Sequence, residues 1–238
     1  QMYVWLDALT CYPNGVKYLS NEKDSISDYW ENTTHIVGKD ILRHHAIYWP
    51  AFLMAAKLKL PKRIFAHGWW TNEGDKISKS LGNVIDPLEL IDKYGLDQFR
   101  YFMLREVPFG NDGDFSVKAL EGRINSDLAN DLGNLCQRSL SMANKHLNNE
   151  IHYISLDEAE LKILESAIEL NNNLKDMAMV QNISDYIKAV WELINTANKY
   201  FNESEPWKIV KSDIKQLNKI LFTTAELIKI IAIYIFPI

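Results

Sequence analysis

Lysine and serine side chains gather in one short stretch, Lys76-Ile77-Ser78-Lys79-Ser80, which Gly74 and Gly82 bracket. Ammonium groups act as compact point charges toward phosphate, and serine hydroxyls with free backbone amides complete an anion-binding concavity. The spacing Gly-x4-Gly-Lys-Ser/Thr of a Walker loop is absent. The stretch predicts a loop that stabilises charge developing on a polyphosphate, and a solvated surface turn is the competing interpretation.

A second group of residues combines aromatic rings with a histidine. Ile41, His45 and Trp49 follow one another at intervals of four, so a helix over this stretch places them on one face. Ile41, His45 and Trp49 could therefore line one side of a pocket together. Trp5 and Tyr12 are further aromatic candidates upstream. Ordinary core packing of an amphipathic helix is the alternative.

A third pattern lies in the second half of the chain. Asn130, Asn134 and Arg138 also step by four, and Trp207 follows Pro206 at a helix break. Amide and guanidinium groups can read unstacked RNA bases, and an exposed indole can stack on one. A solvated helix face is the alternative interpretation.

Strands and helices must position these residues. Helical stretches at Ile41–Leu60 and Pro87–Tyr94 separate short apolar runs in the first half, which predicts a parallel sheet covered by helices. The apolar runs are Met2–Leu6, Thr34–Val37, Ile64–His67 and Tyr101–Leu104.

The second half follows a different pattern. All ten glycines lie at or before Gly133, and long amphipathic runs follow. The apolar residues Ile187, Val190, Trp191 and Ile194 recur at the helical period. The pattern predicts a helical bundle with breaks near residues 152–156, 204–206 and 211–213.

Composition excludes several classes of protein. The net charge is −5, so a broad basic surface for nucleic acid is absent and any RNA contact must be local. Two cysteines, Cys11 and Cys136, predict neither a disulfide scaffold nor a zinc site. No run reaches the roughly 18 apolar residues of a membrane span, and the first residues lack the basic region expected of a signal peptide, so we expect none. We expect an intracellular protein, and the abrupt apolar ends predict a piece of a longer one.

The segment Lys76–Asn83 resembles the signature loop of class I aminoacyl-tRNA synthetases, with Ile77 where methionine is commonest. Three upstream segments resemble the methionyl-tRNA synthetases within that class: Tyr3–Ala8, Val37–Pro50 and Ile64–Trp70. The resemblance covers essentially the whole chain.

The resemblance implies an α/β fold followed by an all-α region. Residues 1–85 are expected to be the C-terminal half of a Rossmann-like catalytic domain with a parallel sheet. Residues 86–121 are expected to form a stem-contact or connecting region, and residues 122–238 a helical anticodon-binding domain truncated at its end. The family's second ATP motif, of the His-x-Gly-His type, and its zinc-knuckle cysteines would lie upstream. We therefore expect this chain alone to be inactive and to hold no zinc ligands.

The resemblance also implies roles for individual residues. Lys76 and Lys79 would be catalytic, with Lys79 the principal contributor. ATP binding would involve Asp40, Gly68, Lys76, Ser78, Lys79 and Ser80. The methionine site would comprise Trp5, Ala8, Tyr12, Ile41, His45 and Trp49. A CAU anticodon would be read by Asn130, Asn134, Arg138, Pro206 and Trp207. Leu9 departs from the family pattern, in which proline is common at this position.

The expected activity is that of a methionine–tRNA ligase, which uses ATP with Mg²⁺ and takes methionine and tRNA(Met), including the initiator tRNA, as substrates. The expected location is the bacterial cytoplasm, or the mitochondrial matrix for an organelle-targeted homologue, with no membrane partner. A related class I synthetase for leucine, valine, isoleucine or cysteine is one alternative, and the segment Gly38–Pro50 argues against it. A non-catalytic tRNA-binding paralogue is another, and the paired Lys76 and Lys79 argue against that.

Overall fold

The computed structural model describes residues 5–19 and 26–238, except for the side chains of residues 16–19, 26–28 and 79. The chain divides into two compact units. The first comprises Gln1–Thr71 with Gly110–Gly113, and the second comprises Asn72–Phe109 with Asp114–Ile238. Each unit has its own cluster of buried apolar side chains.

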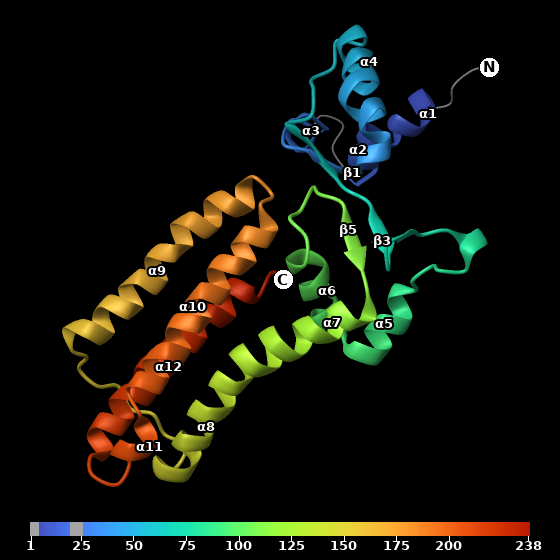
Figure 1. The fold of residues 1–238 in the computed structure, drawn as a ribbon. Helices are drawn as coiled ribbons and strands as arrows, with labels where there is room; N and C mark the ends of the chain where they lie inside the picture. Colours follow the sequence, from blue (N-terminus) through green and yellow to red (C-terminus); the bar gives the residue numbers. More distant parts are fainter. Residues whose placement is uncertain (1–4, 20–25) are drawn as a thin grey trace. The chain divides into compact units, whose positions relative to one another are not determined.

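A two-stranded parallel sheet with helices around it forms the first unit. Strands β1 (Thr34–Gly38) and β2 (Arg63–His67) pair in register from Thr34 opposite Arg63 to Gly38 opposite His67. The crossover between the strands contains η1 (Lys39–Ile41), the π-helical turn η2 (His44–Tyr48) and α4 (Trp49–Ala55). The helices α1 (Trp5–Leu9), α2 (Cys11–Leu19) and α3 (Ile26–Glu31) precede the sheet (Figure 1). The buried core consists of Leu9, Trp30, Trp49 and Leu53.

The structure confirms two of the predicted strands in this unit, and each is one residue longer than expected. Of the apolar run Met2–Leu6, residues 2–4 lie outside the described part, and from Trp5 the chain is helical rather than extended. The helix expected to reach Leu60 ends at Ala55. Lys57 adopts a left-handed φ of 57°, and the Leu58 N–H bonds to the Leu53 carbonyl, the hydrogen-bonding pattern of a Schellman cap.

Short strands and two helices come next along the chain. Strands β3 (Trp70–Asn72), β4 (Asp75–Lys76) and β5 (Gly113–Phe115) form a sheet of order β4-β3-β5, and the 3-10 turn η3 (Lys79–Leu81) follows β4. Helix α5 (Pro87–Tyr94) has the predicted bounds, because Asp86 accepts a hydrogen bond from the Leu88 N–H at its start and Gly95, with φ 97°, ends it.

The predicted strand at Tyr101–Leu104 is wrong, because these residues lie in helix α6 (Leu96–Arg105). An apolar run this short does not distinguish a strand from a buried helical turn. Tertiary contacts decide the outcome. Tyr101 packs against Trp191 with ring centroids 4.6 Å apart and donates a 2.7 Å hydrogen bond to buried Asp127.

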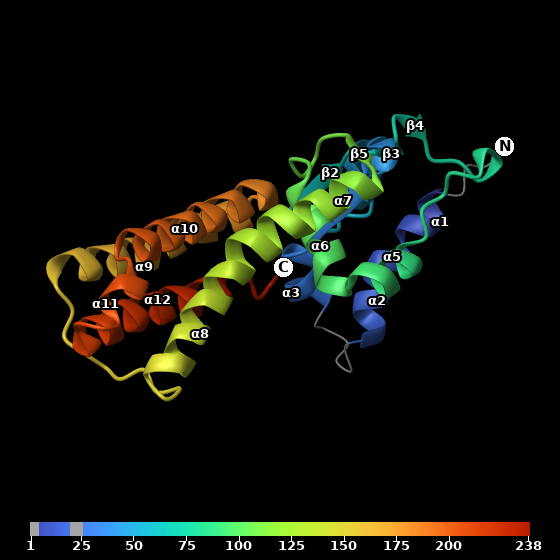
Figure 2. The ribbon, with the colours of Figure 1, turned by 60° about the horizontal axis from the view of Figure 1, so that its bottom comes forward.

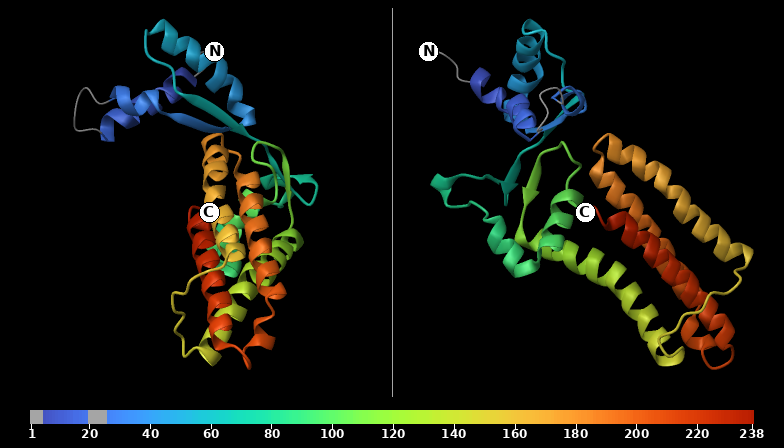
Figure 3. Two further views of the ribbon diagram at one scale, coloured as in Figure 1. Left: turned by 90° about the vertical axis from the view of Figure 1, so that its left-hand side faces the viewer. Right: turned by 180° about the vertical axis from the view of Figure 1, so that it is seen from behind.

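The remainder of the second unit is the predicted helical bundle. Helix α7 (Val117–Arg123), the π-helical segment η4 (Ile124–Gly133) and α8 (Asn134–His146) form one continuous helical run (Figure 2). Helices α9 (Glu158–Met179), α10 (Ile183–Glu203) and α12 (Ile214–Ile235) pack side by side, with the short α11 (Pro206–Ile209) before α12 (Figures 1 and 3). All three predicted breaks are present. The predicted stripe on α10 is buried, including Ile187 and Ile194 at 0% exposure.

The architecture confirms the expected class at a coarse level, with small sheets first and mostly helices afterwards. No helix in residues 5–19 or 26–238 is both long and apolar enough to cross a membrane. The same residues contain no group of three or more His, Cys, Asp or Glu side chains that could hold a metal ion.

Candidate functional site

A tight hairpin joins β3 and β4, and the lysine–serine stretch begins at the end of β4. Glu73 and Gly74 form the turn with φ values of 53° and 85°, the left-handed pair typical of a type I′ hairpin. The Gly74 N–H also donates a 2.8 Å hydrogen bond to the Asp114 carboxylate. Lys76 ends β4 and is exposed, so its ammonium group is accessible to a ligand.

Asn83 fixes the shape of the loop that follows. Its side-chain oxygen accepts from the Ser78 N–H at 2.9 Å, and its side-chain NH₂ donates to the Lys76 carbonyl at 3.0 Å. Its own carbonyl accepts from the Asn72 side chain at 3.0 Å. Asn83 has no predicted role, although its place directly after Gly82 is a sequence signal for a turn.

Ser78 and Ser80 lie together inside this loop, with their hydroxyl oxygens 2.7 Å apart. The Ser80 N–H also points at the Ser78 hydroxyl, at 3.3 Å. The side chain of Lys79 lies outside the described residues, and its backbone begins η3. The loop thus gathers two hydroxyl groups close in sequence to Lys76, while the N–H groups of Ser78 and Ser80 are donated within the loop itself. Hydroxyl groups next to an exposed lysine are the chemistry expected of an anion-binding turn.

In the first unit, Gly38, Asp40 and Gly68 lie at the carboxyl ends of the two parallel strands. Ligands of open α/β sheets bind at this edge. A Cβ at Gly38 would lie 2.4 Å from the Asp40 carboxylate oxygen, so only glycine lets that carboxylate fold over the strand end. A Cβ at Gly68 would lie 2.2 Å from the backbone oxygen of Asn111, so glycine is required there as well.

An ion pair that the sequence did not reveal lies at the same edge. Lys39 Nζ is 2.5 Å from the Asp112 carboxylate and 4.4 Å from the centre of the Trp69 ring. Asp112 also accepts a 2.9 Å hydrogen bond from the Trp69 N–H. These two bonds hold the pKa of Asp112 below its usual value, with the Lys39 bond the larger cause. The partners are 73 residues apart, so no local pattern could predict the contact.

The aromatic–histidine group in the first unit contains a short hydrogen-bonded chain. The His45 Nδ1 atom is 3.0 Å from the Ile41 carbonyl, which can only accept, so Nδ1 carries the proton and donates it. In the neutral imidazole the other nitrogen, Nε2, is an acceptor, and the Tyr12 hydroxyl donates to it at 2.8 Å. His45 is 1% exposed. Burial raises the pKa of Tyr12, which keeps its hydroxyl protonated.

Other predicted members of the amino-acid pocket surround this chain. Trp49 is buried and Ile41 is half-buried, which supports the predicted shared face. The ring of Trp5 lies 6.4 Å from that of His45 and stacks on His44 at 4.3 Å. Ala8 is exposed on α1.

In the helical bundle, the structure brings Arg138 and Trp207 together. The guanidinium carbon of Arg138 lies 5.4 Å from the Trp207 ring centre and 4.8 Å from that of Phe201. Arg138 also donates a 2.8 Å hydrogen bond to the side-chain oxygen of Asn202, a residue outside the predicted RNA-binding group. Because Asn202 is neutral, it orients the guanidinium group without neutralising its charge.

The remaining residues of the predicted RNA-binding group frame this pair. Asn134 begins α8 and is exposed, and Asn130 is exposed within the π-helical segment. Pro206 is buried at the start of α11, and it fixes the position of Trp207, which is 45% exposed. The arrangement leaves one indole, one guanidinium group and two amides accessible on neighbouring elements of the bundle.

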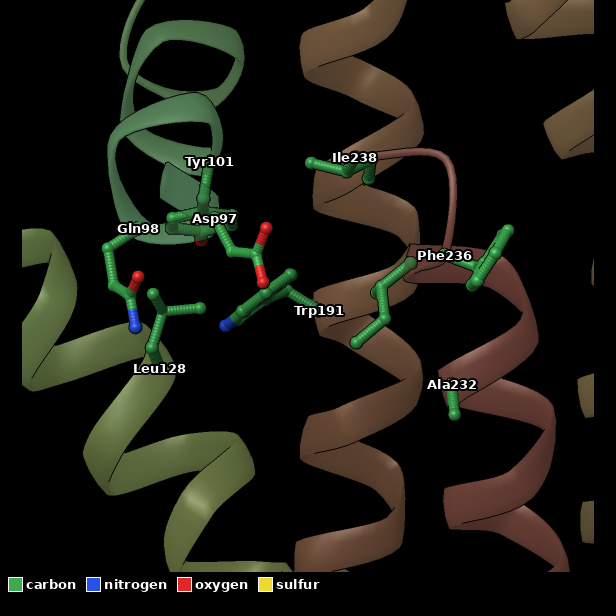
Figure 4. Close-up of a pocket in the computed structure, with 9 residues that line it drawn as sticks. Asp97, Gln98, Tyr101, Leu128, Trp191, Ala232, Phe236 and Ile238 are labelled. Atoms are coloured by element: carbon green, nitrogen blue, oxygen red, sulfur yellow. The ribbon is translucent and has the colours of Figure 1, made fainter. Parts of the chain in front are cut away.

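A half-open groove of about 550 Å³ also lies in the second unit, and none of the predicted site residues line it. Its walls are mostly apolar, with polar side chains of α6 at one side (Figure 4). The lining residues are Asp97, Gln98, Tyr101, Leu128, Trp191, Ala232, Ile235, Phe236 and Ile238.

Solved structures resemble this chain closely. A Mycobacterium tuberculosis methionyl-tRNA synthetase in complex with methionyl-adenylate matches with a TM-score of 0.92 and 44% identity, covering 99% of this chain and 47% of that protein. The apo form of the same synthetase matches with a TM-score of 0.88 and 41% identity over the same shares of the two chains.

Sequence comparisons agree with the structural ones. Methionine–tRNA ligases of Mycobacterium leprae and Brucella suis are 44% and 47% identical, over 100% and 99% of this chain. The chain spans about half the length of these relatives, 45% and 46%. Residues 1–140 match the family model for class I tRNA synthetases of the M type. On this evidence the chain belongs to the class I tRNA synthetases (M).

Proposed function

We propose that the protein of which this chain is part activates methionine with ATP and transfers it to tRNA(Met), initiator tRNA included. The observation that carries the proposal is the match, at a TM-score of 0.92, to a synthetase bound to methionyl-adenylate. The hydrogen-bonded aromatic pocket around His45 and the hydroxyl-rich loop after Lys76 support it, because each suits one of the two substrates.

Adenylate formation needs no protein nucleophile. The methionine carboxylate attacks the α-phosphorus of ATP, a new oxygen–phosphorus bond forms, and the bond to pyrophosphate breaks. Lys76 and Lys79 would counter the charge on the departing pyrophosphate, together with the Ser78 and Ser80 groups. Asp40 and Gly68 would bind substrate at the strand ends, and Mg²⁺ would accompany ATP through its phosphate oxygens. The tRNA 3′ hydroxyl then attacks the adenylate carbonyl and releases AMP.

We assign residues 1–85 to the C-terminal half of a Rossmann-like catalytic domain, 86–121 to a connecting region and 122–238 to anticodon binding. Trp5, Ala8, Tyr12, Ile41, His45 and Trp49 would form the methionine site. Asn130, Asn134, Arg138, Pro206 and Trp207 would read the anticodon. Half of the relatives' length lies outside this chain, so we expect these 238 residues alone to be inactive, and the intact enzyme to work in a bacterial cytoplasm or mitochondrial matrix.

Amino-acid-dependent ATP–pyrophosphate exchange on the intact gene product tests the proposal against a panel of amino acids. Exchange with methionine alone is the expected result. Exchange with leucine, valine, isoleucine or cysteine would agree with a class I synthetase but would contradict the assignment of the pocket to methionine. A folded protein that binds tRNA but exchanges with no amino acid would be a non-catalytic binding paralogue.

A further inference from the structure

Asn198 lies outside every predicted site, and it joins helix α10 to the π-helical segment η4. Its side-chain NH₂ donates to the Asp131 carbonyl of η4 at 3.0 Å and to the Ile194 carbonyl of its own helix at 3.2 Å. Asn198 and Asp131 are 67 residues apart, so only the packing of the helices creates this contact. Both protons of the Asn198 amide are used within the protein, and neither is available to a ligand.

The segment that Asn198 contacts has an unusual backbone. In a π-helix each N–H bonds to the carbonyl five residues back, and the Asn134 N–H follows this rule by bonding to the Ala129 carbonyl. π-helices are rare and occur mostly as single turns, often at functional sites. A π-helical segment of ten residues therefore needs support from the elements packed against it.

A buried carboxylate supplies part of this support. Asp127 is 7% exposed and accepts a hydrogen bond from the Tyr101 hydroxyl of α6 at 2.7 Å. The Ser126 hydroxyl and the Arg123 guanidinium group donate to the same carboxylate, at 2.5 Å and 3.4 Å. Burial and the hydrogen bond to Asp127 raise the pKa of Tyr101, so its hydroxyl stays a donor. Segment η4 is thus anchored to α6 through Asp127 and to α10 through Asn198.

Asn130 lies between the two anchor points, three residues after Asp127 and one before Asp131, and it is exposed. The bonds of a π-helix span one residue more than those of an α-helix, so a π-helical turn holds more residues. The direction in which Asn130 leaves the helix therefore depends on the form of η4. If η4 became α-helical, Asn130 would turn about the helix axis relative to Asn134 and Arg138 of α8.

On the basis of the proposed function, we propose that Asn198 is a positioning residue for tRNA binding. Its hydrogen bond to the Asp131 carbonyl holds η4 in the π-helical form and so directs Asn130 toward the RNA. Asn202, which bonds to Arg138, follows Asn198 by four residues and shares its face of α10. Helix α10 thus fixes the RNA-binding helical run at two points, and the Asn198 contact serves Asn130.

A double-mutant cycle on the intact protein tests this, with the Kd for a tRNA(Met) transcript measured by filter binding. Asn198→Leu keeps the size of the side chain and removes its donors. We expect it to weaken tRNA binding about three- to tenfold in the wild-type background. In Asn130→Ala protein the same change should cost less than about twofold, because the residue through which Asn198 acts is gone. Thr196→Val, which removes an exposed hydrogen bond within α10, is the control and should leave the Kd unchanged.

Two outcomes would overturn the inference alone. Wild-type tRNA affinity in Asn198→Leu would reduce Asn198 to packing, and an equal loss in both backgrounds would show that it does not act through Asn130. A wild-type protein that does not bind tRNA(Met) would instead refute the proposed function, and the inference with it. If thermal unfolding shows that Asn198→Leu is not folded, Asn198→Asp replaces it in the same cycle, because aspartate keeps the shape of the side chain without its donors.

Discussion

The ring cluster around His45 in the first unit and the lysine–serine loop of the second are built in opposite ways, and each suits a different kind of ligand. Around His45, side chains are buried and most protons are already donated within the protein. In the loop, Lys76 and Ser80 are exposed, and the Asn83 side chain bonds to the backbone atoms of Ser78 and Lys76. An apolar side chain needs a wall whose polar groups are already paired, whereas a polyphosphate needs cations and donors that are still available.

The strongest test of this comparison is Lys79→Ala in the intact protein. Removal of a cation that stabilises charge in the transition state should lower the rate of methionine activation about 10²- to 10³-fold. The affinity for tRNA should stay within about twofold, because Lys79 is not among the residues proposed to read the anticodon. Pyrophosphate exchange and a filter-binding assay measure the two quantities, with Lys62→Ala as the surface control. Equal losses in both assays would contradict the division of roles.

Trp207→Ala should show the reverse pattern. The loss of one base–aromatic stack is worth about 1–3 kcal/mol, so tRNA affinity should fall roughly 5- to 150-fold while pyrophosphate exchange is unchanged. Arg138→Lys should weaken binding as well, because lysine cannot reproduce the planar fork that bonds to Asn202 and stacks on Trp207. Tyr153→Ala, an exposed aromatic elsewhere in the bundle, is the matched control. If Trp207→Ala kept full tRNA affinity, the proposed role of the indole in tRNA binding would be wrong.

Asn83→Ala tests whether the shape of the loop matters as well as its charges. The change deletes both side-chain hydrogen bonds that hold Ser78 and Lys76 in the turn. We expect about a tenfold fall in kcat for activation, smaller than for Lys79→Ala because the lysines remain. Asn144→Ala, which loses one exposed contact to Asn149, is the control. A wild-type kcat in Asn83→Ala would mean that substrate orders the loop unaided.

The ring cluster should also be sensitive to pH. The pKa of His35, whose ring centre lies 4.4 Å from that of Tyr12 and 5.8 Å from that of His45, is lowered in the folded state, mainly by burial. As pH falls, His35 is therefore protonated in the unfolded chain before it is protonated in the folded chain. Stability is therefore fully present above the unfolded pKa of about 6.5, and it falls as pH drops below that value. The slope from this single proton is at most about 1.4 kcal/mol per pH unit. Urea unfolding between pH 7.5 and 5 measures it, and His35→Phe should reduce the slope while Ile36→Ala, at the exposed neighbouring position in β1, should not.

The smallest effect concerns neither binding region. Gly122 lies inside α7, where an added Cβ would meet no atom within 4 Å. Gly122→Ala should stabilise the bundle by about 0.5–1 kcal/mol, because glycine loses more backbone freedom in a helix. Gly133→Ala is the informative contrast, because its Cβ would lie 3.0 Å from the Leu128 carbonyl of the π-helical segment. Thermal unfolding of the two variants should show opposite shifts, and equal shifts would contradict the packing argument.

Local sequence patterns determined a large part of the secondary structure of this protein. The helix at Pro87–Tyr94 carries its own start and stop signals in Asp86 and Gly95, and its bounds follow from the sequence. The apolar stripe of α10 and the three breaks of the bundle also follow, because helix period and breaker residues act over a few positions. The lysines and serines of the loop are likewise neighbours in sequence.

Only tertiary structure decided the partners of these residues. Tyr101–Leu104 is helical because Tyr101 packs on Trp191 and bonds to Asp127. The contact of Arg138 with Asn202 spans 64 residues, and that of Lys39 with Asp112 spans 73. The ring of His35 contacts rings from α2 and α3, which precede β1 in the sequence, and from η2, which follows it. Sequence spacing fixes which side chains share a face, but hydrogen-bond pairing between distant faces is set only when the faces pack.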